Sequence, residues 1–342
     1  MGNSDFYYYF CIAKNVFMDY KSIIFTPIKE EKQRFVELFN DSLHSSNPLL
    51  NQVLAHVLQT SGKKMRPMLA LLSAKLFGKV TEEVYHAAIA LELLHNASLM
   101  HDDVVDESDE RRGKPSVNAA FSNKVAVLSG DFMLATGLLE VSKTNSLRIM
   151  EIIFGLGKEL ADGEILQLNN QAVEEHSYEV YYKVIRKKTA VLFEACSSIG
   201  AISGGATEEE VEMMRQFGEY LGLCFQIKDD IFDYIADPKQ LGKPTGNDML
   251  EGKLTLPVLY VLNKTQDAQA KRLAAKVKAD TITADEIAWL IQFTIGEGGI
   301  QYAEQIMQDY RAKAVVLLDN LPNNEVKQAL IAYLDYVIER EK

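Results

Sequence analysis

Cysteine, proline and tryptophan are scarce in this chain of 342 residues. It contains three cysteines (Cys11, Cys196 and Cys224), eight prolines and one tryptophan. Cysteines so few and so widely spaced form no zinc-binding pattern, and they fit a reducing compartment. We therefore expect a cytoplasmic protein.

Several catalytic and binding patterns are also missing. The chain has no phosphate loop of the Walker type, no dinucleotide-binding glycine pattern, no His-Glu-x-x-His and no calcium-binding Asp loop. Its 48 Asp and Glu residues outnumber its 36 Lys and Arg residues, and the net charge of −12 argues against nucleic acid as a partner. No stretch of about 18 residues is free of charge, so we expect at most peripheral contact with a membrane.

Apolar residues recur at steps of three and four along almost the whole chain, without runs of alternating strand pattern. Helices are expected over residues 82–106, 125–139 and 208–235. The pattern predicts an all-α fold, a large helical bundle formed by one domain of residues 18–342. The first 17 residues include an apolar segment and precede a second methionine, Met18, so we interpret them as a mis-called start or a disordered extension.

Two nearly identical aspartate clusters end two of the expected helices. Their residues are Asp102, Asp103, Asp106, Asp229, Asp230 and Asp233. Like charges four residues apart destabilise a helix, and acidic groups at its C-terminus oppose the helix dipole. A solvated acidic face is the alternative interpretation, but both clusters lie on apolar helices. Since carboxylates beside substrate phosphate are ligands for Mg²⁺, the pair predicts two or three Mg²⁺ ions that hold a diphosphate.

Basic residues gather in four short segments, at residues 63–66, 111–114, 186–188 and 243–253. Arg and Lys are the usual protein groups that bind phosphate. The alternative is that they only neutralise the aspartates. Acidic clusters with basic groups around them predict two anionic ligands, one bound through metal and one without it.

These motifs, taken together and in this order, resemble the trans-isoprenyl diphosphate synthases, and most of all the long-chain octaprenyl and heptaprenyl diphosphate synthases. Residues 102–106 followed by Arg111 and Arg112 resemble the first aspartate-rich motif of that family, and residues 226–233 with 242–243 and 252–253 resemble the second. Residues 62–67 resemble the loop that binds isopentenyl diphosphate, and residues 188–189 resemble the Lys-Thr pair. The resemblance implies an isoprenoid synthase type I fold around a deep central cavity, and a homodimer.

The resemblance also implies a role for each matched residue. The expected Mg²⁺ ligands are Asp102, Asp106 and Asp229, with Asp103, Asp230 and Asp233 beside them. The expected contacts of the allylic diphosphate are Arg111, Lys188, Lys243 and Lys253, and those of isopentenyl diphosphate are Lys63, Arg66, His95 and Arg112. Lys188, Thr189 and Gln226 are the expected catalytic residues, and Thr189 and Gln226 stabilise the allylic cation through their oxygens. Without the match, His95 would be interpreted as a core or capping histidine.

Product length depends, in that family, on residues that precede the first aspartate motif. Ala97 and Ser98 are small and leave a tunnel open, while Leu94, one turn deeper, could begin to restrict it. Ile153 or Phe154 is a second candidate for the floor. We expect a long-chain product of about six to eight isoprene units, a quinone side-chain precursor. The tunnel for such a product must continue past this helix, because the stretch from Asp102 to Leu94 covers only about 12 Å. The alternative for Ala97 and Ser98 is close helix packing.

Other functions remain open. A short-chain farnesyl or geranylgeranyl diphosphate synthase would differ only in the depth of the tunnel. A terpene cyclase would normally carry an Asn/Ser/Glu type of second motif where this chain has aspartates. A non-catalytic subunit of a heteromeric synthase would usually lack the aspartate clusters, although the chain could be the catalytic half of such a heteromer.

Overall fold

The computed structural model describes residues 19–60, 62, 64–171, 177–235 and 245–340. The predicted extension of residues 1–17 and the predicted substrate contacts Lys63 and Lys243 lie outside these described residues.

Helices account for nearly all of the regular structure, which confirms the predicted all-α class. The first half of the chain forms α2 (Tyr20–Phe25), η2 (Thr26–Ile28), α3 (Lys29–Ser42), α4 (Pro48–Thr60), α5 (Met65–Phe77), α6 (Glu82–Val105), α7 (Val117–Ala120), α8 (Asn123–Ser142) and α9 (Leu147–Gln171). The second half forms α10 (Tyr178–Ile185), η3 (Arg186–Ala190), α11 (Val191–Gly204), α12 (Glu208–Ile235), α14 (Asn247–Leu250), α15 (Leu256–Lys264), α16 (Ala268–Lys278), α17 (Ala284–Gly296), α18 (Gly299–Leu317) and α19 (Glu325–Glu339). The three helices expected from the sequence correspond to α6, α8 and α12.

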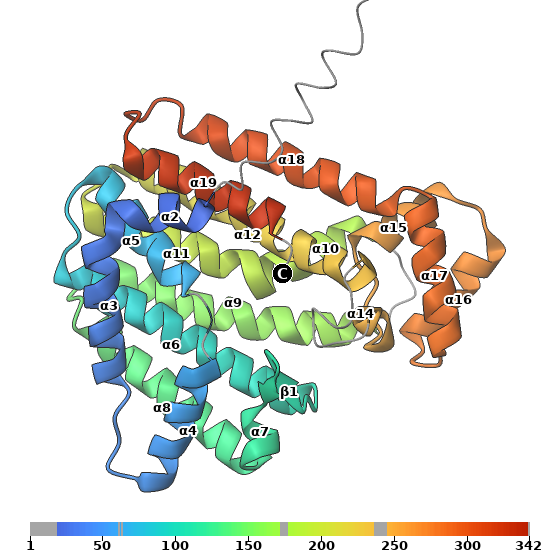
Figure 1. Cartoon of the computed structure of the whole chain (residues 1–342), viewed down its shortest axis with the longest axis horizontal. Helices are drawn as coiled ribbons and strands as arrows, with labels where there is room; N and C mark the ends of the chain where they lie inside the picture. Colours follow the sequence, from blue (N-terminus) through green and yellow to red (C-terminus); the bar gives the residue numbers. More distant parts are fainter. Residues whose placement is uncertain (1–18, 61, 63, 172–176, 236–244, 341–342) are drawn as a thin grey trace, which may run out of the picture.

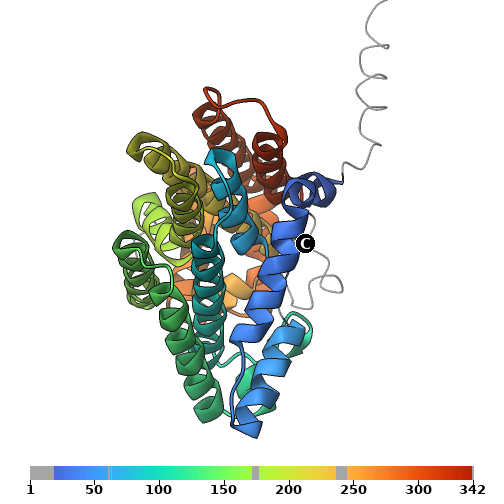
Figure 2. The same ribbon diagram turned by 90° about the vertical axis from the view of Figure 1, so that its left-hand side faces the viewer.

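The central helices are packed at very short distances. Helix α11 lies between α5 and α12, and α6 packs on α5 and α8 (Figure 1, Figure 2). A Cβ atom added to Gly200 of α11 would lie 2.3 Å from the carbonyl oxygen of Ala70 in α5. One added to Gly218 of α12 would lie 2.4 Å from the carbonyl oxygen of Phe193 in α11. Interiors are close-packed, so these glycines hold the helices in one relative position.

A short β-hairpin follows α6, and the sequence analysis did not predict it. Strand β1 (Glu110–Arg111) pairs antiparallel with β2 (Lys114–Pro115). The turn residues Arg112 and Gly113 have φ values of 56° and 74°, as a tight hairpin turn requires. The hairpin contains Arg111 and Arg112. It follows the C-terminal end of α6, where the first aspartate cluster lies.

Candidate active site

Among the residues that the structure describes, Asp103 of the first aspartate cluster has an ion-pair partner, whereas Asp102 and Asp106 have none. Asp103 is buried, and the Nε atom of Arg111 donates to both of its oxygens at 2.8 Å. Burial raises the pKa of Asp102 to about 6, helped by the negative charges of Glu164 and Asp106 and opposed by Lys188. Burial also raises the pKa of Asp106. Asp102 and Asp106 therefore lack full compensation of their charge.

The second cluster, at the end of α12, has its carboxylates held in three different ways. Asp230 is buried and accepts hydrogen bonds from the Tyr181 hydroxyl at 2.5 Å and from the Gln226 amide at 2.9 Å. Burial raises the pKa of Asp230 to about 7 despite these two donors. Asp233 accepts hydrogen bonds at 2.9 and 3.1 Å from two backbone amides at the start of α14. Asp229 is paired with a residue from the far end of the chain.

That residue is Arg340, directly after α19, which the sequence did not identify. Its Nη2 atom donates to Asp229 at 2.6 Å and to the carbonyl oxygen of Phe225 at 3.0 Å. Its guanidinium lies over the rings of Phe225 and Phe232, 4.1 and 5.4 Å from their centroids. In Figure 1, α19 ends near the middle of the view, beside α12. No motif marked Arg340, because only the return of α19 to the bundle brings it here.

Asp248 also belongs to the second cluster and was missed. Burial, together with the charges of Asp230 and Asp233, raises its pKa well above the usual range. Lys253 acts electrostatically on both Asp248 and Asp106, so it links the two clusters. Its ammonium group also donates to Glu251 at 2.5 Å. The position of Asp248 between two predicted substrate contacts, Lys243 and Lys253, was the available signal.

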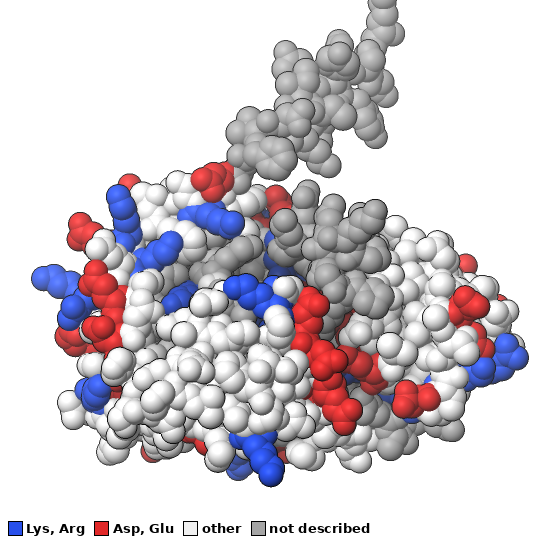
Figure 3. Space-filling view, turned by 60° about the horizontal axis from the view of Figure 1, so that its bottom comes forward, with Lys and Arg blue, Asp and Glu red and all other residues white. Residues whose placement is uncertain are grey.

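These carboxylates suit a hard divalent cation. Oxygen donors in a partly buried site, with pKa values raised by burial and by neighbouring carboxylates, suit such a cation because its charge compensates theirs. Among the described residues, no three His, Cys, Asp or Glu side chains already converge as a complete metal site. The donor set therefore fits ions that take one or two carboxylates each and complete their shells with water and phosphate oxygens. Figure 3 shows acidic side chains gathered near the middle of one face, with basic side chains next to them.

A second, cationic group of residues lies where α5, α6 and the hairpin meet. The Nη1 atom of Arg66 is 3.0 Å from Nε2 of His95. Burial and the charges of Arg66 and Arg112 lower the pKa of His95 well below its usual range, so the ring is neutral and accepts that hydrogen bond. A Cβ atom added to Gly62 would lie 2.7 Å from Nη1 of Arg112, so Gly62 lies directly beside this guanidinium.

Glu92 provides a counter-charge for this group and was not predicted. It is buried, and although burial raises its pKa, the nearby charges of Arg66 and Lys64 oppose that shift. Glu92 is the single charged residue in the apolar run of residues 87–94, and this was a usable signal.

The three basic residues 186–188 point to different places, although the sequence presented them as one phosphate-binding segment. Of the three, only Lys188 lines a cavity, which borders the second aspartate cluster at Asp230 and Asp248. Its ammonium group contacts Glu164 at 2.5 Å and Gln167 at 3.0 Å, both on α9. The next residue, Thr189, donates its hydroxyl proton to the Gln226 side-chain oxygen at 2.7 Å.

The cavity has a volume of about 220 Å³. Its polar wall contains Gln167, Lys188, Gln226, Asp230, Asp248 and Lys253. The structure thus brings together predicted residues from η3, α12 and the segment before α15.

The predicted chain-length residues lie along α6 beneath the first cluster. Ala97 is fully buried, Leu94 is 9% exposed, and Ser98 is half-buried. A Cβ atom added to Gly157 of α9 would lie 3.8 Å from Cδ1 of Leu94, so α9 packs against α6 at the level of Leu94. Ile153 is buried, whereas Phe154 is 51% exposed.

Comparisons with known proteins agree with this arrangement. A sequence profile of the Polyprenyl synthetase family matches residues 47–294. Heptaprenyl diphosphate synthase component 2 of Geobacillus stearothermophilus is 37% identical over 314 residues, 92% of this chain and 95% of that protein. The crystal structure of geranylgeranyl pyrophosphate synthase from Bacteroides thetaiotaomicron has 50% sequence identity and a TM-score of 0.84, over 94% of this chain and 100% of that one. A polyprenyl synthase from Caulobacter crescentus CB15, complexed with calcium and isoprenyl diphosphate, has 31% identity and a TM-score of 0.88 over 94% and 98%.

The hydroxyl group of Tyr181 is expected to stabilise the fold through Asp230. Tyr181→Phe leaves a buried carboxylate without one of its two donors, which should lower the free energy of unfolding by about 1 to 3 kcal/mol. Urea titration followed by circular dichroism measures this loss. Tyr20→Phe is the matched control, because it removes an exposed hydroxyl bonded to Glu339 at 2.7 Å. Equal losses in the two variants would contradict the prediction.

Proposed function

The chain belongs to the polyprenyl synthetase family and is a trans-prenyltransferase, and we propose that it is a Mg²⁺-dependent synthase of long-chain polyprenyl diphosphates. In this proposal it condenses isopentenyl diphosphate with an allylic diphosphate and repeats the step to about 30 to 40 carbons, a length that requires a tunnel deeper than the first turns of α6. The observation that carries the proposal is the pair of aspartate clusters linked through Lys253, next to the cationic group of Arg66, His95 and Arg112. The domain of residues 18–342 then acts as one catalytic unit.

The two aspartate clusters hold the allylic diphosphate in this mechanism. Asp102, Asp106 and Asp229 bind Mg²⁺, and bound Mg²⁺ stabilises the negative charge that develops on a leaving diphosphate. Lys188 and Lys253 line one cavity. Their fixed positive charges also favour departure of the diphosphate. The Arg111 guanidinium stays paired with Asp103, and its positive charge also favours departure of the diphosphate.

The cationic group binds isopentenyl diphosphate without metal. Arg66 and Arg112, with the predicted Lys63, supply the charge for its diphosphate. With Nε2 of His95 accepting from Arg66, the other ring nitrogen carries the proton and is a donor. The Arg66 guanidinium lies 5.0 Å from the Phe193 ring centroid, which fixes its plane.

Thr189 and Gln226 stabilise the allylic cation between these two groups. The Thr189 hydroxyl proton is directed to Gln226, so the lone pairs of the Thr189 oxygen remain available to a positive carbon. The C–O bond of the allylic diphosphate breaks with its electron pair on the leaving diphosphate. The double bond of isopentenyl diphosphate then forms a C–C bond to the allylic cation, and the resulting carbocation loses a proton to the released diphosphate. We assign no side-chain base to that loss.

Incubation of the purified protein with Mg²⁺, labelled isopentenyl diphosphate and farnesyl diphosphate tests the proposal. We expect a product ladder that ends at about 30 to 40 carbons by mass spectrometry, since small residues occupy the first turns below Asp102. No elongation with Mg²⁺ present would refute the proposal for this chain acting alone. Addition of a partner subunit would then test the heteromeric alternative, and the relative named component 2 supports that alternative.

A geranylgeranyl diphosphate synthase is the second candidate. Half of the aligned residues are identical to those of the Bacteroides thetaiotaomicron geranylgeranyl pyrophosphate synthase. The approach of Gly157 to Leu94 supports a floor at that level of α6. A ladder that stops at 20 carbons would favour this candidate and leave the chemistry unchanged.

Substitution of Ala97 tests the position of the tunnel. Ala97→Phe adds a ring below the first cluster and should shorten the main product by at least one isoprene unit, as measured by mass spectrometry. Ala97→Ser is the control and should preserve product length. Because Ala97 is fully buried, thermal unfolding of each variant is measured as well. A folded, active Ala97→Phe variant with unchanged product length would contradict the tunnel assignment.

We further propose that the protein is a homodimer through α8 and α9. Their large exposed apolar residues are Val127, Leu128, Leu138, Leu139, Leu147, Phe154, Ile165 and Leu168. The two helices pack together at the edge of the bundle (Figure 2). Helix α8 has a mean hydropathy of 1.4, enough to cross a membrane by length and composition, but exposed apolar residues on two helices that pack together suit a second copy better. The buried free thiols of Cys196 and Cys224 support a cytoplasmic location.

A charge on this face should separate the two copies. Leu128 is 68% exposed, and Leu128→Glu would place two carboxylates in an apolar interface, so analytical ultracentrifugation should show a shift from dimer to monomer. The control Val316→Glu changes a 64% exposed apolar residue on α18. A wild-type monomer, or a Leu128→Glu dimer as stable as the wild type, would refute the proposed interface.

A further inference from the structure

The turn that carries Lys188 and Thr189 is an unusual one. Residues Arg186–Ala190 form one turn of π-helix between α10 and α11, closed by a hydrogen bond from the Val191 amide to the carbonyl oxygen of Arg186. Single π turns inside helices are rare and occur mostly at functional sites. Since a π turn is less stable than an α turn, surrounding contacts must hold it in place.

Two glycines, on two different helices, lie close to the backbone of this turn. A Cβ atom added to Gly163 of α9 would lie 3.1 Å from the carbonyl carbon of Lys187 and 3.2 Å from the nitrogen of Lys188. These two atoms form the peptide bond that precedes the side chain of Lys188. A Cβ atom added to the second glycine, Gly222 of α12, would lie 2.5 Å from the Cα atom of Ala190, at the end of the turn. No side chain fits at either glycine without displacing the turn.

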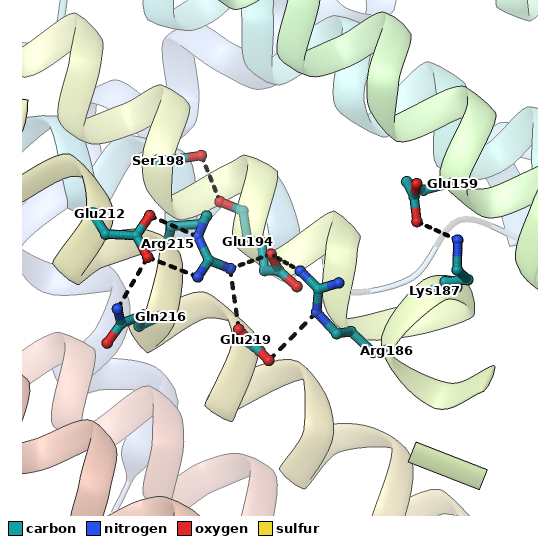
Figure 4. Close-up of polar contacts among 9 residues, drawn as sticks. All are labelled: Glu159, Arg186, Lys187, Glu194, Ser198, Glu212, Arg215, Gln216 and Glu219. Carbon is teal, nitrogen blue, oxygen red and sulfur yellow. Dashed lines mark hydrogen bonds and ion pairs between the residues drawn. The ribbon is translucent and has the colours of Figure 1, made fainter. Parts of the chain in front are cut away.

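Ion pairs hold the start of the turn (Figure 4). Arg186 donates to the buried Glu194 of α11 at 2.9 Å, and its Nε lies 3.4 Å from Glu219 of α12. Arg215 donates to the same Glu194 oxygen at 2.6 Å and to Glu219 at 3.1 Å, so two guanidiniums share two carboxylates. A buried carboxylate between two such cations is costly to disturb.

The middle of the turn is tied to α9. Lys187 contacts Glu159 at 2.7 Å and Asp162 at 2.6 Å, both on α9. Arg186 and Lys187 therefore use their charges on structural partners, while Lys188 lines the cavity and Thr189 donates to Gln226. The turn is held on α9, α11 and α12 at once.

We propose that Gly163, Gly222 and the Arg186–Glu194–Arg215 ion pairs are positioning residues, which fix Lys188 and Thr189 against Gln226 and the aspartate clusters. This inference rests on the proposed prenyltransferase reaction. The Thr189–Gln226 hydrogen bond of 2.7 Å and the Gln226–Asp230 hydrogen bond of 2.9 Å connect the turn to the second cluster. A displacement of about 1 Å at such a site can reduce the rate about a hundredfold.

Gly163→Ala tests this role through kinetics. The added methyl group displaces the peptide before Lys188, so kcat should fall at least about tenfold, while KM for isopentenyl diphosphate should change less than about twofold. The KM expectation follows because Arg66, His95 and Arg112 lie outside this turn. Gly299→Ala is the matched control, because its Cβ would lie 2.6 Å from the carbonyl oxygen of Pro257, in a crowded site between other helices.

The ion pairs are tested by a second set of variants. Arg186→Ala should lower kcat about tenfold, and Arg186→Lys should restore part of the rate because it keeps a positive charge beside Glu194. Arg148→Ala is the control, because it removes an exposed arginine that donates to Glu208 at 2.5 and 2.6 Å. Thermal unfolding of all variants separates loss of rate from loss of fold.

Calorimetric binding of inorganic pyrophosphate with Mg²⁺ provides a readout that does not depend on turnover. Gly163→Ala should weaken this binding about tenfold through misplacement of Lys188, and Gly299→Ala should not. An active wild type with equal kcat and equal pyrophosphate affinity in both glycine variants would overturn the positioning role. An inactive wild type would overturn the proposed function alone, and the calorimetric comparison would still decide the role of Gly163.

Discussion

Burial of closely spaced carboxylates is the constraint on which this site depends. Asp102 and Asp106 end α6, and Asp229, Asp230 and Asp233 end α12; burial raises the pKa of each of these five groups. Buried negative charge is tolerated only where donors or cations compensate for it. The elements that meet at these two helix ends supply hydrogen-bond donors and positive charges. A divalent cation that carries a diphosphate fits the negative charge that these groups leave uncompensated.

Acidic partners hold the basic residues of the site in place. Arg111 lies on Asp103, Arg340 on Asp229, Lys188 on Glu164 and Lys253 on Glu251. The positive charges are therefore held in position by the protein itself. Positive groups that are already oriented need no reorganisation when charge develops on a leaving group, which is the main source of electrostatic catalysis.

Local pattern determines how far such a site can be predicted from sequence. The aspartate clusters and the pairs Lys188–Thr189 and Arg111–Arg112 are short runs at helix ends, so one segment identifies each. Asp248 and Glu92 are single residues whose importance comes from neighbours on other helices. Arg340 is separated from Asp229 by 111 residues, and only packing of α19 brings them together. The side chains of residues 186–188 likewise have partners on three different helices, α9, α11 and α12. These contacts follow from a π turn that helical periodicity does not indicate.

The sequence by itself determined the all-α class, the approximate limits of the long helices, the two aspartate clusters and the family to which the motifs belong. Periodic burial and helix ends are encoded within a few residues, so these features need no knowledge of the fold. Only the tertiary structure decided that Arg111 pairs with Asp103, that His95 is neutral beside Arg66, and that Gly163 and Gly222 hold the turn of Lys188. Those features depend on distances between helices, which close packing sets across the whole bundle.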